Sequence, residues 1–104
     1  MRRQRRQSIA VVLYTRYNCD LCDQADELIV REARGCTYRI IDIDGDDELV
    51  KRYGIRIPVV SVNGQDVAEG ALALGVVRAA VRAAVRTQRS PDTKPGAPRW
   101  RFWA

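Results

Sequence analysis

Two cysteines stand two residues apart in the stretch Cys19-Asp20-Leu21-Cys22. This stretch follows the near-continuous apolar run Ile9–Thr15, which is typical of a buried strand, and it opens a helix-like run that extends to Arg34. Cysteines at this spacing at a strand-to-helix junction can form a disulfide with little movement of the backbone. The unpaired N–H groups and the partial positive charge of a helix N-terminus favour the thiolate, which is the form that attacks a disulfide. The sequence therefore predicts a redox-active pair of thiols.

Length and composition indicate one small domain with a single core. The chain has 104 residues, of which 46% are hydrophobic. No apolar stretch approaches the roughly 18 residues that cross a membrane, and the run after the basic residues 1–7 is too short for a signal peptide. We therefore expect a cytoplasmic monomer without membrane attachment. In a reducing compartment a C-x-x-C pair is more often catalytic or metal-binding than structural.

The charge of the chain differs between its ends and its middle. The net charge is +5, but residues 8–77 hold seven basic and twelve acidic side chains, and the surplus of arginine lies before and after them. Like charges recur at helical spacing at Arg78, Arg82, Arg86 and Arg89. Basic ends suit acidic proteins or nucleic acid. Solubility and an arginine-rich composition explain them more simply, so we favour a solvated face over a nucleic-acid surface.

Periodicity and turn residues predict the order β-α-β-α-β-β-α. After the first strand and helix, the predicted elements are a strand at 37–43, a short helix ending at Gly54, strands at 58–62 and 65–69, and a helix at 71–88 with Leu74 in its apolar stripe. Asn18 is the expected N-cap of the first helix, and Asn63-Gly64 predicts a tight hairpin. A right-handed crossover makes the first two strands parallel. The expected fold is a three-layer α/β domain with a mixed four-stranded sheet.

The C-x-x-C pair in this element order resembles the thioredoxin superfamily, and in particular glutaredoxin-like proteins with a short C-x-x-C. The segments that carry the resemblance are 13–25, Ile41-Asp42-Ile43-Asp44, 53–60 and Asn63-Gly64. The resemblance implies a thioredoxin/glutaredoxin-like domain at residues 9–88. A basic N-terminal arm at 1–8 and a flexible basic and aromatic tail at 89–104 lie outside it.

Several side chains acquire expected roles. Cys19 is the predicted nucleophile because it lies nearer the helix N-terminus and solvent, and Cys22, one turn further along, is the predicted resolving thiol. The resemblance implies that Ile57-Pro58 is a cis peptide facing the cysteines, whose Ile57 backbone pairs with an extended thiol substrate. The alternative is a trans proline at the start of an edge strand. The resemblance also places Arg16 where glutaredoxins hold a carboxylate of glutathione; the alternative is a solvated loop arginine.

Two positions depart from the glutaredoxin pattern. Asp20 stands where proline is common, and a carboxylate beside a thiolate raises the pKa of the thiol, so we expect Asp20 to tune Cys19. After Glu69-Gly70, Ala71 and Leu72 stand where glutaredoxins commonly carry a glycine and an acidic pair that hold the γ-glutamyl end of glutathione. This departure favours protein disulfides or a dedicated reductase over glutathione.

The sequence thus predicts a thiol-disulfide oxidoreductase that reduces protein or small-molecule disulfides. We expect no bound cofactor, and electrons from glutathione or from a flavin-dependent, thioredoxin-reductase-type partner. Two alternatives stay open: a non-catalytic binding module that uses the basic ends and the tail at Trp100–Trp103, and an iron–sulfur carrier in which Cys19 and glutathione bridge two chains. A structural zinc site is not favoured, because the chain has no histidine and only one further cysteine, Cys36, which we expect to be a packing residue.

Overall fold

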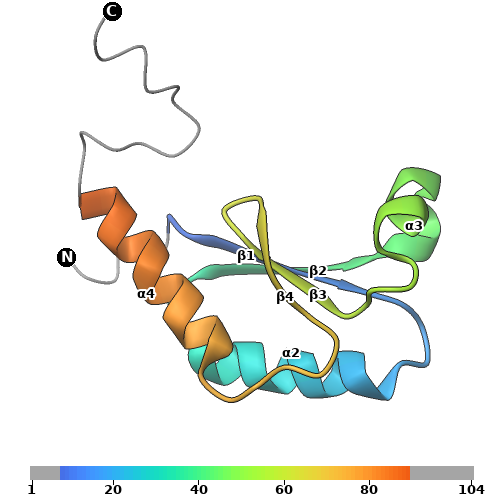
Figure 1. The fold of residues 1–104 in the computed structure, drawn as a ribbon, viewed down its shortest axis with the longest axis horizontal. Coiled ribbons are helices and arrows are strands. Elements are labelled where there is room, and N and C mark those ends of the chain that lie inside the picture. The colour runs from blue at the N-terminus through green and yellow to red at the C-terminus, as the bar shows by residue number, and fades with distance from the viewer. Residues whose placement is uncertain (1–7, 90–104) are drawn as a thin grey trace, which may run out of the picture.

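The computed structural model describes residues 8–89, which form a four-stranded sheet with helices on both faces (Figure 1). The elements in chain order are β1 (Ala10–Thr15), α2 (Asp20–Glu32), β2 (Thr37–Asp42), the 3-10 turn η1 (Ile43–Gly45), α3 (Asp47–Tyr53), β3 (Val59–Val62), β4 (Gln65–Glu69) and α4 (Val76–Arg89). The strand order is β2-β1-β3-β4, with β1 parallel to β2 and the other pairs antiparallel. The predicted α/β architecture with a mixed sheet is confirmed. Apart from Ser8 and Arg89, the predicted arm and tail lie outside the described residues.

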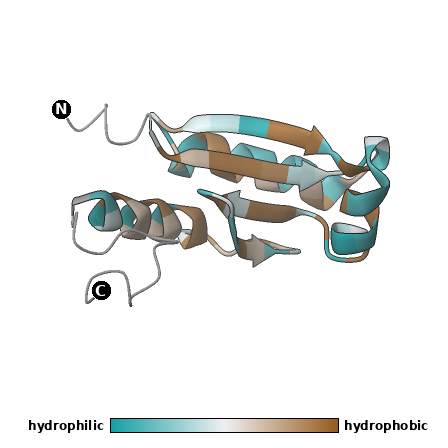
Figure 2. Ribbon diagram, turned by 90° about the horizontal axis from the view of Figure 1, so that it is seen from above, coloured by the Kyte–Doolittle hydropathy of each residue, from teal (hydrophilic) through white to brown (hydrophobic). Residues whose placement is uncertain are grey.

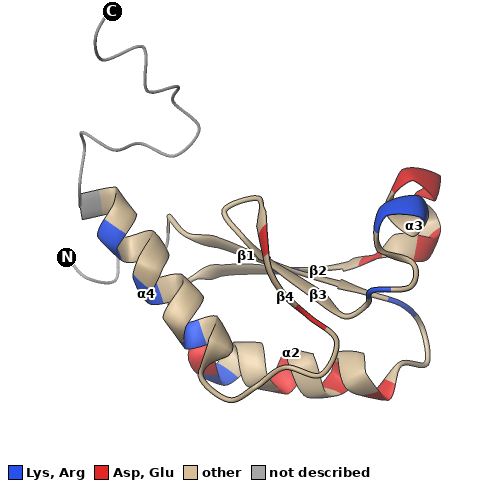
Figure 3. Cartoon of the chain, in the orientation of Figure 1, with Lys and Arg blue, Asp and Glu red and all other residues tan. Residues whose placement is uncertain are grey.

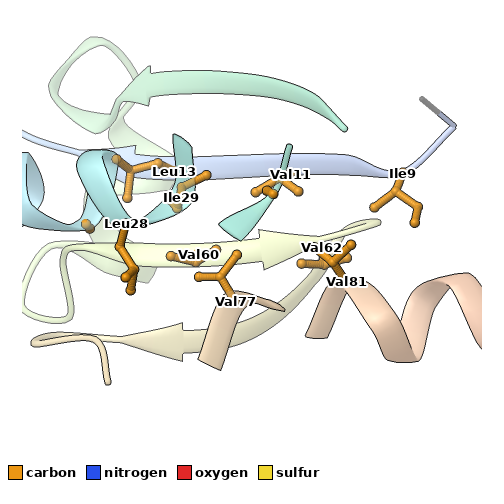
Figure 4. Packing of buried hydrophobic residues seen from close by; sticks show 11 residues of the cluster. Ile9, Val11, Leu13, Leu28, Ile29, Val60, Val62, Val77 and Val81 are labelled. Carbon is orange, nitrogen blue, oxygen red and sulfur yellow. The ribbon is translucent and has the colours of Figure 1, made fainter. Parts of the chain in front are cut away.

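The larger core lies between the sheet and the helices α2 and α4 (Figure 4). Alternate side chains of β1 and β3, such as Val11 and Val60, point to this side and are fully buried against Ile29 of α2 and Val77 of α4. On the other side of the sheet, a smaller cluster around Tyr53 packs beneath α3. The central strands β1 and β3 are mostly apolar, the outer strands β2 and β4 are more polar, and the helices are amphipathic (Figure 2).

The hairpin between β3 and β4 forms where the sequence predicts it. Asn63 has φ 51° and Gly64 has φ 82°, and positive values at both central residues define the type I′ turn that fits twisted strands. The Asn63 backbone N–H donates to the Ala10 carbonyl at 2.8 Å, and its side-chain oxygen accepts from the Ala10 N–H at 2.9 Å. The hairpin tip is therefore tied to the start of β1.

Two helix starts differ from the prediction. Cys19, not Asn18, is the N-cap of α2; Asn18 has φ 64°, a left-handed conformation that asparagine tolerates better than most residues. The last helix begins at Val76 instead of residue 71 because Gly75 also has positive φ and breaks the helical backbone before it. Leu74 therefore lies in a loop and is 86% exposed, so its predicted place in the apolar stripe is wrong.

The N-terminus of α4 at Val76 is capped by a side chain from another helix. Glu32, the last residue of α2, is only 5% exposed and accepts backbone hydrogen bonds from Gly75 at 2.7 Å and from Val77 and Arg78 at 3.1 Å each. Burial raises the pKa of Glu32, but these three bonds and the charge of Arg78 outweigh it, and the pKa is lowered. The ionised carboxylate thus satisfies N–H groups that a helix start leaves without partners.

We expect Glu32→Gln to lower the free energy of unfolding by about 1–3 kcal/mol near neutral pH, because an amide nitrogen then faces one of the N–H donors. A lowered folded-state pKa means that the carboxylate stabilises the fold above the ordinary value of 4.5 and loses this effect as the pH falls through the folded value. Urea unfolding from neutral to acidic pH measures the difference in the free energy of unfolding between wild type and Glu32→Gln. This difference should shrink as the pH falls below the folded-state pKa of Glu32. Glu27→Gln, an exposed change on the same helix, serves as control. A constant difference at all pH values contradicts the capping role.

Candidate functional site

Three strand ends meet at one edge of the sheet. Thr15, the last residue of β1, pairs with Asp42, the last residue of β2, and Tyr14 pairs with Val59, the first residue of β3. The chain therefore leaves β1 toward the cysteines at the point where Pro58 leads into β3. This register brings the predicted site residues of three separate segments to the same edge.

The two cysteines form a disulfide across the first turn of α2. Their Cα atoms are 5.2 Å apart, within the range that a disulfide spans. Cys19 caps the helix, and its Sγ accepts a hydrogen bond from the Cys22 backbone N–H at 3.1 Å. Cys22 is only 3% exposed, whereas Cys19 is partly exposed. Asp20, the first residue of the helix, is exposed beside it.

The peptide bond between Ile57 and Pro58 is cis, the conformation that the resemblance implies. The Pro58 carbonyl accepts from the Gly70 N–H at 2.8 Å, which fixes the start of β3 to the end of β4. The Ile57 N–H donates to the Tyr53 carbonyl at 3.1 Å, while within residues 8–89 no donor pairs with the Ile57 carbonyl. A substrate strand that used both groups of Ile57 would have to replace the bond to Tyr53.

The side chain of Arg16 is bound by other groups of the protein. Its guanidinium binds Asp44 through two nitrogens, with Nη2 at 2.7 Å and Nε at 3.0 Å from Oδ1, and Nη1 donates to the Gly54 carbonyl at 3.3 Å. The hydrogen bonds and charge of Asp44 raise the pKa of Arg16. The pair ties the loop before the cysteines to η1 and to the end of α3. An external carboxylate would have to compete with Asp44 for this fork.

An aromatic and charged cluster, which the sequence patterns do not predict, supports the segment before Pro58. The rings of Tyr14 and Tyr53 stack with centroids 4.3 Å apart, and the Arg56 guanidinium lies 5.3 Å from the Tyr53 ring centroid. Arg56 also forms ion pairs with Glu69 at 2.9 Å and Asp66 at 3.4 Å, and the Tyr53 hydroxyl donates to Asp66 at 3.1 Å. The cluster connects α3, the loop that carries Ile57 and the edge strand β4.

Residues 8–89 contain no group of three or more His, Cys, Asp or Glu side chains placed to hold a metal ion. None of the helices in this part is long and apolar enough to cross a membrane. Cys36 is partly buried and packs against the larger core.

A disulfide at the start of the helix after β1, with a cis proline opening the adjacent strand, defines a thioredoxin-fold domain with a C-x-x-C pair. Within this class, the sequence matches one particular family. The model of the glutaredoxin-like domain family (DUF836) matches residues 10–86, and the chain belongs to this family. None of the curated proteins matches the chain.

Solved structures agree with this assignment. The X-ray structure of the structural genomics target XcR50 from X. campestris is 34% identical, covers 70% of this chain and 96% of its own, and superposes with a TM-score of 0.61. A thioredoxin from Halobacterium salinarum (17% identity, 79% of both chains, TM-score 0.59) and glutaredoxin C1 from a Populus hybrid (14% identity, 85% of this chain and 86% of its own, TM-score 0.53) share the fold.

After reduction, we expect iodoacetamide to modify Cys19 at least about ten times faster than Cys22, because Cys22 is buried. Asp20→Asn removes a negative charge beside Cys19 and should move the pH dependence of its alkylation to lower pH. Mass spectrometry of the modified peptides over a pH series measures both effects. Asp47→Asn, an equal charge change on α3, is the control. Equal rates at the two cysteines, or an unchanged profile in Asp20→Asn, contradict these roles.

Proposed function

We propose that the protein is a thiol-disulfide oxidoreductase that reduces disulfides through Cys19 and Cys22. The observation that carries the proposal is the disulfide at the N-terminus of α2, in which Cys19 is partly exposed and Cys22 is buried. The helix N-terminus supplies N–H groups and a partial positive charge that favour a thiolate at Cys19 once the bond is reduced. The Ile57 carbonyl at the same sheet edge also supports the proposal, because no donor within residues 8–89 pairs with it and an extended substrate can bind it.

The proposed cycle moves two electrons. The Cys19 thiolate attacks a substrate disulfide, forms a mixed disulfide with one half and releases the other half as a thiolate, which takes up a proton. The Cys22 sulfur, having lost its proton, then attacks Cys19 and releases the second substrate thiol. The substrate has gained two electrons and the protein is left with the Cys19–Cys22 disulfide. A dithiol donor restores both thiols, or two glutathione molecules do so and leave as glutathione disulfide.

The contacts of the site support a protein dithiol, kept reduced by a flavin-dependent reductase, over glutathione as the donor. Glutathione carries two carboxylates, and the cation suited to one of them, Arg16, is already bound to Asp44. The N–H groups at the start of α4, a natural carboxylate site, are bound to Glu32. The loop between β4 and α4 offers Ala71 and Leu72, whose side chains carry no polar group that could bind glutathione.

We expect Cys19→Ser to abolish the reduction of insulin disulfides, because the attacking sulfur is lost. Cys22→Ser should retain the first attack and accumulate a mixed disulfide at Cys19, since no second sulfur can release it. Cys36→Ser, which changes a core-packing thiol, should leave the initial rate within about twofold. Turbidity follows insulin reduction, and mass spectrometry detects the adduct. Full activity in Cys19→Ser would contradict the proposal.

In the alternative, a non-catalytic binding module, the ends of the chain carry the function. Removing the C-terminal tail therefore separates the two hypotheses. A protein that ends at Arg89 keeps all of the site residues and should reduce insulin as fast as the full chain if the proposal holds. Undetectable turnover in the full chain, together with unchanged partner binding in Cys19→Ser, would favour the binding module.

We expect slow turnover with glutathione alone. The rate should rise about two- to fivefold in Asp44→Asn, because this change frees Arg16 for an external carboxylate. The size of the rise follows from the modest strength of half-exposed ion pairs. The assay couples glutathione disulfide formation to glutathione reductase. Asp47→Asn makes the same change of charge nearby without freeing Arg16, so its rate should stay at the wild-type value. A rate in Asp44→Asn equal to that of the control contradicts competition between Asp44 and glutathione.

A further inference from the structure

A hollow of about 260 Å³ lies between α2 and the loop that joins β4 to α4. Figure 1 shows this loop, residues 70–75, running alongside α2. Its apolar lining comes from both sides, with Leu21 and Leu28 on the helix and Leu72 and Leu74 on the loop. Leu28 and Leu72 also pack against the larger core, so they form a fixed floor. Two alanines, Ala25 and Ala71, and the polar side chains Gln24, Glu27 and Arg31 complete the lining.

Two of the lining leucines are exposed to water. Leu74 is 86% exposed and Leu21 is 42% exposed, although both are large apolar side chains. Single exposed leucines are common, but two that face one hollow beside a candidate site indicate a surface that a partner covers. The loop that holds Leu74 is fixed in place, because Glu32 binds the Gly75 N–H at its end. The hollow is therefore formed before any partner binds.

The hollow begins at the first turn of α2, which also carries the disulfide. Leu21 lies between the two cysteines in the sequence and lines the hollow as well. From Cys19 to Gln24 the helix rises roughly 8 Å at 1.5 Å per residue. An extended peptide covers that length in about two or three residues at roughly 3.3 Å each. A polypeptide joined to Cys19 through its own cysteine can therefore place a nearby side chain in the hollow.

The acidic side chains at the border of the hollow indicate the charge of the partner that it binds. Asp20, Asp23 and Glu27 are all exposed and lie along one side of α2. The only basic residue of α2 is Arg31 in its last turn, and a row of basic residues lies along α4 (Figure 3). Arg16, in the loop before the cysteines, is paired with Asp44. A ligand that enters from the disulfide end meets a negative border, so cationic residues near its apolar side chain are favoured.

We propose that this hollow is a substrate subsite that selects protein disulfides in which an apolar side chain lies two or three residues from the reacting cysteine, next to a cationic residue. The inference rests on the proposed oxidoreductase function and specifies its substrate class. A polypeptide fits the lining, since Gln24 and Arg31 can bond peptide groups while the leucines bury the side chain. A small disulfide without this extension reaches only Cys19.

The test compares two peptides, each with one cysteine held as a mixed disulfide with thionitrobenzoate. One carries leucine at the third residue on either side of the cysteine and lysine beyond it; the other has serine in place of both leucines. Reaction with pre-reduced protein releases the peptide thiol and thionitrobenzoate as the Cys19–Cys22 disulfide forms, and the colour gives the rate constant. We expect the leucine peptide to react about tenfold faster, as burial of a leucine side chain implies.

Leu74→Ser should reduce this ratio to about two or less, whereas Val30→Ser, an equal change at an exposed position of α2 away from the hollow, should keep it. A ratio near one in the wild type, or an undiminished ratio in Leu74→Ser, overturns the subsite. If neither peptide is reduced, the proposed function fails by itself. Peptides with alanine in place of cysteine then test the subsite without redox chemistry. Shifts of the Leu28 and Leu72 amide signals with the leucine peptide alone support it, and their absence overturns it.

Discussion

The register of β1 against its two neighbours is the constraint on which the site depends. Parallel pairing sets Thr15 beside Asp42, and antiparallel pairing sets Tyr14 beside Val59. A shift of one residue in either pairing would turn the buried side chains of a strand to the opposite face. The large core cannot tolerate such a shift, because Val11 and Leu13 are fully buried on one side. Hydrophobic packing thus fixes the distance between the cysteines and the proline loop, which lie far apart in the chain.

Two carboxylates of the protein occupy positions where an anionic ligand would otherwise bind. Asp44 holds Arg16, and Glu32 holds the first N–H groups of α4. Each bond also organises the backbone, since the first fixes the loop before the cysteines and the second fixes the loop that carries Leu74. The same contacts therefore build the surface around Cys19 and use groups that could otherwise bind small anions. Specificity and stability are connected here because the groups that recognise carboxylates are used inside the fold.

The sequence was sufficient for features that depend on local chemistry. Runs of apolar and β-branched residues predicted the strands, Asn63-Gly64 predicted the hairpin, and the spacing of the cysteines predicted the disulfide-forming pair. It failed where a distant partner decides the local structure. Helical periodicity from residue 71 onward looked continuous, but positive φ at Gly75 and the cap from Glu32 move the helix start to Val76. The partner of Arg16 was equally hidden, because Asp44 lies 28 residues further along the chain.

Helix α2 connects these features, since its two ends perform different tasks. Its first turn carries the cysteines and the acidic border, where partners must have access. Its last turn buries Glu32 and holds α4, where access would be costly because a buried carboxylate needs all of its hydrogen bonds. Between them, Ala25, Leu28 and Ile29 bind the helix to the sheet. The rigid helix thereby keeps the loop of Leu74 at a constant distance from Cys19, so the hollow and the reactive sulfur can act on one substrate chain.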